Sequence, residues 1–299
     1  MDIGTNSVLL SVCELKGREP IVLYEGAVTT RLGEGLLESG SLKTEAMNRT
    51  IEAVKSYLKI CDRLKVERIK VIGTSAIREA DNSDRFVSMI ERLGLELRII
   101  SGDEEAYLSF ISVAMDSSIT PPLSAPFAVV DVGGGSTELI IGEGRRMIFH
   151  RSFPLGAVKL TERFLRTDPP KEEELEEMIE FVREGIDVEL YGVRVMVGIG
   201  GTITTLAAVK LELLKFDPLA VHGLKFSYDE VSRVCRRVWG VSLEDRRKLK
   251  GLDPTRADII VAGTAIVRTV MEKLGAEELI VSYKGVRYGV IYEHLIHLT

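Results

Sequence analysis

Apolar and polar residues follow two different periods along the chain, and these periods predict strands and helices in succession. The segment 95–100 alternates with a period of two, as a half-buried strand does. Residues 44–64 instead repeat apolar side chains every three to four positions, which predicts a long amphipathic helix. A second helix is predicted over 82–93, between the strand at 95–100 and another at 66–73. This β–α–β rhythm is typical of mixed sheets covered by helices, so the chain is assigned to the α/β class.

One segment between these elements is typical of a linker. Residues 116–126 are rich in serine and proline and separate a helical segment from a new strand at 127–131. We therefore predict two domains, the first over 1–117 and the second over 118–284.

Composition and charge narrow the classes of partner. The net charge of −6 disfavours general binding to nucleic acid, so any polyanionic substrate needs a local positive cluster. No apolar run approaches the roughly 20 residues that span a bilayer, and the N-terminus lacks the pattern of a signal peptide. We expect a cytoplasmic protein that binds neither membranes nor nucleic acid.

Two similar turns recur about 130 residues apart. Asp2–Ser7 and Asp131–Thr137 each precede an apolar strand, and both follow the pattern Asp-x-Gly-x-small-Ser. The repetition predicts a duplicated domain whose equivalent hairpin loops face each other.

Such turns suit phosphate and a divalent cation. Glycine lets several backbone N–H groups point at one place, and the serine and threonine hydroxyls add donors. Asp2 and Asp131 each supply the hard carboxylate oxygen that Mg²⁺ prefers, alongside phosphate oxygens. The alternative is that both loops are ordinary hairpin turns.

A third glycine motif lies at a predicted strand-to-helix junction. Gly200, Gly201 and Thr202 fall between a strand predicted at 193–197 and a helix predicted at 203–209. A ligand phosphate or ribose can bind there against the helix N-terminus. The spacing matches neither a dinucleotide fingerprint nor a P-loop.

Hydrolysis also needs a group that accepts a proton from water. Ser101 and Glu104 fit a capping box at the start of a helix, which gives Glu104 a structural role. Glu105 lies about 100° further around that helix, and the residues alone favour a surface position for it.

Eight motifs cover the chain from end to end: Asp2–Ser7, Thr74–Asn82, Ile100–Ala106, Asp131–Leu139, Pro154–Glu162, Gly198–Ala208, Val221–Gly223 and Arg256–Gly263. Together, and in this order, they resemble the Ppx/GppA family of exopolyphosphatases and guanosine pentaphosphate phosphohydrolases, in its form with two domains only.

The resemblance implies a fold and an activity. The fold is two ribonuclease-H-like domains of the actin, Hsp70 and sugar-kinase superfold that flank a cleft, with the segment 285–299 packing back onto the first domain. The activity is Mg²⁺-dependent removal of a terminal phosphate from inorganic polyphosphate, from guanosine pentaphosphate, or from both. The oligomeric state is left open, and a homodimer is one option.

The resemblance also implies roles for individual residues. Glu105 would activate the attacking water, and Arg78 would neutralise substrate phosphate. Asp131 and Glu138 would hold the metal, with Asp2 in the matching position of the first loop. The residues expected to contact substrate through the two hairpin loops are Gly4, Thr5, Asn6, Ser7, Gly133, Gly134, Gly135, Ser136 and Thr137.

Two other functions stay open, and departures from the family's pattern leave room for the second of them. Tyr288 stands where the family commonly has glutamate, and the first strand, which begins at Asp2, is expected to be short. One alternative is a kinase or ATPase of the same superfold. The other is a sensor that binds alarmone nucleotides or polyphosphate without turnover.

Overall fold

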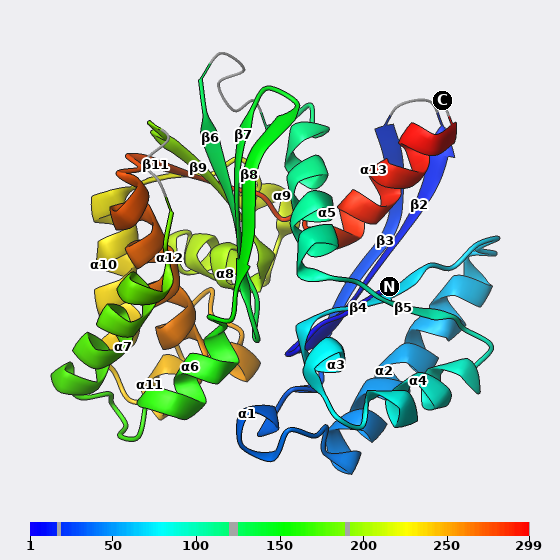
Figure 1. The fold of residues 1–299 in the computed structure, drawn as a ribbon, viewed down its shortest axis with the longest axis horizontal. Coiled ribbons are helices and arrows are strands. Elements are labelled where there is room, and N and C mark those ends of the chain that lie inside the picture. Colours follow the sequence, from blue (N-terminus) through cyan, green and yellow to red (C-terminus); the bar gives the residue numbers. More distant parts are fainter. Residues whose placement is uncertain (17–18, 120–124, 189–191, 299) are drawn as a thin grey trace. The chain divides into compact units, whose positions relative to one another are not determined.

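The structure is a computed structural model that describes residues 1–16, 19–119, 125–188 and 192–298 (Figure 1). It divides into two compact units. Unit 1 comprises Met1–Leu108 and Val286–Thr299, and unit 2 comprises Ser109–Gly285.

Unit 1 is built on a five-stranded sheet with the order β3-β2-β1-β4-β5. The first three strands are antiparallel, whereas β4 and β5 run parallel to β1. The strands are β1 (Asp2–Ile3), β2 (Ser7–Lys16), β3 (Glu19–Thr29), β4 (Val71–Gly73) and β5 (Leu97–Ile99).

Unit 2 contains a six-stranded sheet with the order β10-β11-β9-β6-β7-β8. Its strands are β6 (Phe127–Val132), β7 (Thr137–Glu143), β8 (Arg146–Phe153), β9 (Val195–Ile199), β10 (Lys225–Ser227) and β11 (Glu278–Val281). Read from β8, the order β8-β7-β6-β9-β11 repeats the order of unit 1, with the same antiparallel and parallel pairs. The duplicated α/β fold with two ribonuclease-H-like domains is thus confirmed.

Helices pack on these sheets. Those of unit 1 are α1 (Leu36–Ser39), α2 (Thr44–Arg63), α3 (Ser75–Glu79), α4 (Ser83–Glu91) and α13 (Val286–Leu298). Those of unit 2 are α6 (Ala157–Phe164), α7 (Glu172–Gly185), α8 (Gly200–Lys210), α9 (Pro218–Val221), α10 (Tyr228–Trp239), α11 (Leu243–Arg246), the 3₁₀ helix η1 (Pro254–Arg256) and α12 (Ile260–Leu274). The division between the units falls within α5 (Gly102–Ala114), so this helix belongs to both. The domain bounds taken from the sequence stay a prediction.

Each unit has its own apolar core. In unit 1, Ile3 and Val8 of the first hairpin are fully buried with Met47 of α2, and both α2 and α13 contact β2. In unit 2, the almost wholly buried α12 packs against α6, α7, α8 and α10. The cores hold the hairpins β1–β2 and β6–β7 in place, and the glycine turns connect the two strands of each hairpin.

The predicted amphipathic helix is confirmed as α2, but the strand predicted over 66–73 is wrong in its first half, since only Val71–Gly73 is a strand. The reason is the end of α2. Lys65 adopts a left-handed φ of 54°, and the Val66 N–H donates to the carbonyl of Cys61. Val66 therefore closes the helix instead of opening the strand.

Helix α8 also begins earlier than expected. It starts at Gly200 rather than at residue 203, so the glycines of the third motif form its first turn.

Candidate active site

Glu105 lies in the first turn of α5 and is buried, with 7% of its surface exposed. Its Oε2 atom accepts a hydrogen bond from Arg78 Nη1 at 3.2 Å, and the two side chains form an ion pair. The preceding Glu104 closes the helix start as predicted, because it accepts from the Ser101 N–H while its own N–H donates to Ser101 Oγ. Glu104 and Glu105, which are adjacent in the chain, thus lie in different environments. The surface position that the residues alone favour for Glu105 is wrong, because its side chain is buried.

Arg78 reaches Glu105 from α3, the short helix that follows β4. Its Nη1 atom also donates to the carbonyl of Ile100, 2.7 Å away, at the end of the segment that leads into α5. This double contact ties α3 to the start of α5. The role expected for Arg78 on substrate phosphate stays a prediction.

The first glycine loop is held by backbone hydrogen bonds. The Gly4 N–H donates to the Ser7 carbonyl, which closes the β1–β2 turn at 3.0 Å. The Asn6 carbonyl accepts from the N–H groups of Thr30 and Arg31, and the Thr5 carbonyl accepts from Gly33. Thr5 and Asn6 are both buried, so the segment after β3 supports this loop from behind.

Asp2 precedes the loop and is buried at the start of the sheet. Burial raises the pKa of its carboxyl to about 6. One of its oxygens, Oδ1, is buried and has no hydrogen-bond partner among the described residues. A buried carboxylate oxygen without a partner is unfavourable unless a cation or donor satisfies it.

The second hairpin repeats this geometry and adds a second acid. The Gly133 N–H donates to the Ser136 carbonyl at 2.9 Å, as Gly4 does to Ser7. Asp131 and Glu138 are register partners on β6 and β7, so their side chains emerge side by side on one face. In the first hairpin the partner of Asp2 is Leu9, so only the second hairpin carries a carboxylate pair.

Two serines hold these carboxylates. Ser109 Oγ of α5 donates to Asp131 Oδ2 at 3.3 Å, and Ser152 Oγ of β8 donates to Glu138 Oε1 at 2.7 Å. Asp131 and Glu138 are themselves buried, at 9% and 1% exposed, so neighbouring side chains set their directions.

Helix α6 supports the second glycine loop. The carbonyls of Gly133 and Gly134 accept from the N–H groups of Ala157 and Val158 in the first turn of α6. The approach is so close that a Cβ at Gly156 would lie 2.2 Å from the Gly134 carbonyl oxygen.

Thr137, which was expected to contact substrate, lies fully buried at the far side of this loop. Its hydroxyl donates to the Leu155 carbonyl, so in this structure it braces the hairpin.

The third motif lies beside Asp131. Gly200 has a φ of +85°, and a Cβ there would lie 2.6 Å from Asp131 Oδ1. Only glycine therefore allows α8 to begin next to this carboxylate. Thr202 is buried and packs against Gly263 of α12, so its side chain faces the core.

Arg256, at the end of η1, covers the same helix start. A Cβ at Gly201 would lie 2.5 Å from its guanidinium carbon. Burial lowers the pKa of Arg256, and its Nε is buried without a hydrogen-bond partner in the described part of the chain. Arg256 begins one of the motifs that carry the family resemblance, but the sequence alone gave no role for it.

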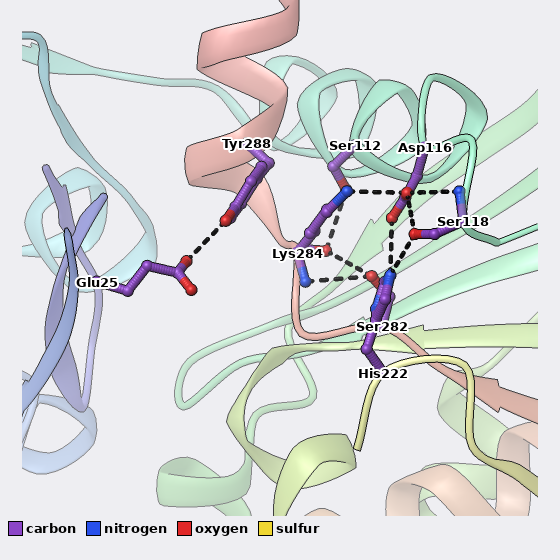
Figure 2. A network of polar contacts seen from close by, with 8 residues as sticks. All are labelled: Glu25, Ser112, Asp116, Ser118, His222, Ser282, Lys284 and Tyr288. Atoms are coloured by element: carbon purple, nitrogen blue, oxygen red, sulfur yellow. Dashed lines mark hydrogen bonds and ion pairs between the residues drawn. The ribbon is translucent and has the colours of Figure 1, made fainter. Parts of the chain in front are cut away.

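A further polar network joins the two ends of unit 2 (Figure 2). Asp116, just beyond α5, accepts from Lys284 Nζ at 2.8 Å and from Ser118 Oγ at 2.6 Å, and it pairs with His222 Nε2 at 3.2 Å. Burial opposes ionisation of Asp116, but the hydrogen bonds from His222, Lys284 and Ser118 outweigh it and hold its pKa well below the usual range. This network explains the histidine of the Val221–Gly223 motif as a structural residue.

Across the described ranges, no three histidine, cysteine or acidic side chains gather closely enough to hold a metal by themselves. Mg²⁺ commonly takes only one or two carboxylates together with substrate phosphates, and the pair Asp131 and Glu138 fits that donor set. Convergence of both hairpins on one anion stays a prediction.

No helix in the described part of the chain has the length and apolar character needed to cross a membrane.

A family model described as "Ppx/GppA phosphatase family" matches residues 11–298. Exopolyphosphatase 2 of Mycobacterium tuberculosis is 34% identical over 310 residues, which cover 97% of this chain and 96% of the relative. Guanosine-5'-triphosphate,3'-diphosphate pyrophosphatase of Photobacterium profundum is 29% identical, and the match covers 98% of this chain but 58% of that longer protein.

Solved structures agree with these matches. A Ppx/GppA family member from Aquifex aeolicus is 34% identical with a TM-score of 0.82, and the match covers 100% of this chain and 97% of the other. An exopolyphosphatase-like protein is 28% identical with a TM-score of 0.92, over 98% of this chain and 96% of the other.

Proposed function

Since this chain belongs to the Ppx/GppA phosphatase family, we propose that it hydrolyses the terminal phosphoanhydride bond of inorganic polyphosphate or of guanosine pentaphosphate. The names of two relatives, an exopolyphosphatase and a guanosine pentaphosphate pyrophosphatase, support these two substrates. The observation that carries the proposal is the buried Glu105, held by Arg78 at the start of α5.

Glu105 is the group that orients the attacking water and accepts its proton. A carboxylate suits this role when its direction is restrained, because in-line attack on phosphorus depends on alignment. The Arg78 contact at 3.2 Å supplies that restraint. Glu104 is less suited to the role, since it accepts from the Ser101 N–H in the capping box and its side chain is about half exposed.

Asp131 and Glu138 would hold Mg²⁺ in unit 2, and Asp2 is the matching carboxylate of unit 1. When bound, the metal neutralises charge on the phosphate oxygens and polarises the phosphorus. The side-by-side carboxylates of the second hairpin support the metal role of Asp131 and Glu138. Within unit 1, the buried Oδ1 of Asp2, which has no hydrogen-bond partner among the described residues, is suited to accept a cation or a donor.

The glycine turns bind the phosphate chain. Gly133 to Ser136 form a turn in which the carbonyls of Gly133 and Gly134 accept hydrogen bonds from the first turn of α6. These bonds fix the direction of the N–H groups in the turn. Preorganised N–H donors stabilise charge on a transferring phosphoryl group. The turn at Gly4 to Ser7 repeats this design in unit 1.

The test is release of inorganic phosphate. The protein is incubated with Mg²⁺ and, separately, with polyphosphate of several lengths, guanosine pentaphosphate or ATP. We expect phosphate from polyphosphate or guanosine pentaphosphate, and its loss when EDTA removes the metal. Phosphate from ATP alone would favour the ATPase or kinase alternative, and tight binding of polyphosphate or guanosine pentaphosphate with no release would favour the sensor.

A further inference from the structure

We propose that Ser109 is a positioning residue for the metal site, because its hydroxyl directs the carboxylate of Asp131. This inference rests on the proposed function in so far as Asp131 holds the metal. It concerns a residue to which neither the motifs nor the family resemblance assigned a role.

The contact is buried on both sides. Ser109 is 0% exposed, and its Oγ lies 3.3 Å from Asp131 Oδ2. That separation is at the long end for an O–H···O hydrogen bond. The contact therefore restrains the direction of the carboxylate more than it stabilises its charge.

The other oxygen of Asp131 faces a different neighbour. Oδ1 lies close to the backbone of Gly200, where a Cβ would come within 2.6 Å of it. With Oδ2 held by α5 and Oδ1 against the start of α8, rotation of the carboxylate is restricted from two elements. Glu138 has an equivalent support, since Ser152 holds its Oε1.

Metal affinity depends on such supports. Residues that hydrogen-bond to metal ligands hold them in the productive direction, and their loss commonly lowers metal affinity about 10- to 100-fold. Because the Ser109 contact is long, the lower end of this range applies. A buried serine that only filled space would have no effect on metal affinity.

Helix α5 offers a matched control. Ser112 is equally buried, and its Oγ donates to the carbonyls of Ser109 and Lys284. It lies one turn along the same helix and touches no carboxylate of the proposed metal site in the contacts described. Ser109→Ala and Ser112→Ala therefore remove the same group from the same helix, but only the first leaves Asp131 without its hydroxyl partner.

The experiment measures Mg²⁺ affinity by calorimetry without substrate. We expect Ser109→Ala to weaken Mg²⁺ binding about tenfold and Ser112→Ala to change it less than about twofold. Ser109→Cys, which keeps a weak S–H donor of similar size, should fall between wild type and Ser109→Ala. A thermal melt of each variant shows whether it is folded. If Ser109→Ala folds poorly, Ser109→Cys still tests the proposal.

The outcomes separate this inference from the proposed function. Equal Mg²⁺ affinity in Ser109→Ala and Ser112→Ala overturns the role of Ser109, even if the wild type releases phosphate. If the wild type releases no phosphate but Ser109→Ala alone weakens Mg²⁺ binding, the inference stands and the proposed reaction fails.

Discussion

Arg78 Nη1 lies 3.2 Å from Glu105 Oε2, and this ion pair joins a short helix after β4 to the first turn of α5. The arginine is 25% exposed at its side chain and the glutamate 9%, so the pair is partly shielded from water. The pair gives Glu105 a fixed direction.

Replacing Glu105 with glutamine should abolish most turnover and leave binding intact. The amide keeps the shape but cannot accept the proton, and positioned general bases contribute about 100-fold or more. We expect phosphate release to fall at least about 100-fold, with substrate affinity changed less than about tenfold, or ~1.4 kcal/mol. Glu104→Gln is the matched control and should keep full activity. Equal activity in both variants contradicts the assignment.

Replacing Arg78 with methionine should lower both activity and stability. The buried Glu105 would lose a charged hydrogen-bond donor, and the loss of a hydrogen bond to a charged group costs about 2 kcal/mol. Urea denaturation measures the stability, and phosphate release measures the activity. The control is Arg98→Met, because Arg98 is exposed and its contacts with Glu104 and Glu293 are both long, at 3.8 Å. Its effect should stay within about 0.5 kcal/mol, and a similar loss in both variants would argue against a special role for Arg78.

The network around Asp116 predicts a loss of stability in acid. Its pKa in the folded state lies well below the ordinary value of an aspartate carboxyl, about 3.9, so the folded state binds fewer protons than the unfolded one. The stabilisation is present above about pH 4 and is lost as the pH falls below that value. The difference in unfolding free energy between wild type and Asp116→Asn should therefore shrink below about pH 4. It is measured by urea denaturation from pH 6 to pH 3.

The exposed Asp245 serves as the control for this pH profile. Hydrogen bonds from Ser242 and Lys248 lower the pKa of Asp245 as well. Because solvent screens this exposed carboxylate, Asp245→Asn should change the profile much less than Asp116→Asn. A constant difference for Asp116→Asn across the whole range would show that the network contributes no pH-dependent stability.

Adding a methyl group at Gly156 should displace the second glycine loop. The new Cβ would meet the Gly134 carbonyl oxygen at 2.2 Å, so either the loop or α6 must move. We expect Gly156→Ala to cost about 2 kcal/mol and to reduce phosphate release. Gly285→Ala meets nothing within 4 Å and should be tolerated. Thermal melts and phosphate assays of both variants distinguish a local clash from a general intolerance of alanine.

Tyr288 has a structural partner in this chain. Its hydroxyl donates to Glu25 Oε1 at 2.9 Å (Figure 2), and Arg287 Nη2 donates to the same oxygen at 3.0 Å. Removing a hydrogen bond to a charged acceptor costs about 1.5 kcal/mol. We expect that loss for Tyr288→Phe in urea denaturation and less than about 0.5 kcal/mol for the more exposed Tyr107→Phe. If both variants unfold alike, the Glu25 contact contributes nothing.

The sequence alone determined the features that depend on local pattern. The amphipathic period of α2, the capping box of Ser101 and Glu104, and the two aspartate-headed turns follow from residues close together along the chain. The duplication was also visible, because the Asp-x-Gly pattern recurs, and the repeated strand order bears it out.

Only the tertiary structure decided the partners of the site residues. Nothing near Glu105 in the chain indicates that Arg78 and the Ile100 carbonyl enclose it, or that Ser109 faces Asp131. These contacts depend on how separate elements pack, because the direction of a buried side chain is set by neighbours remote in sequence. Local periodicity specifies helices and strands, whereas the direction of each carboxylate depends on packing between them.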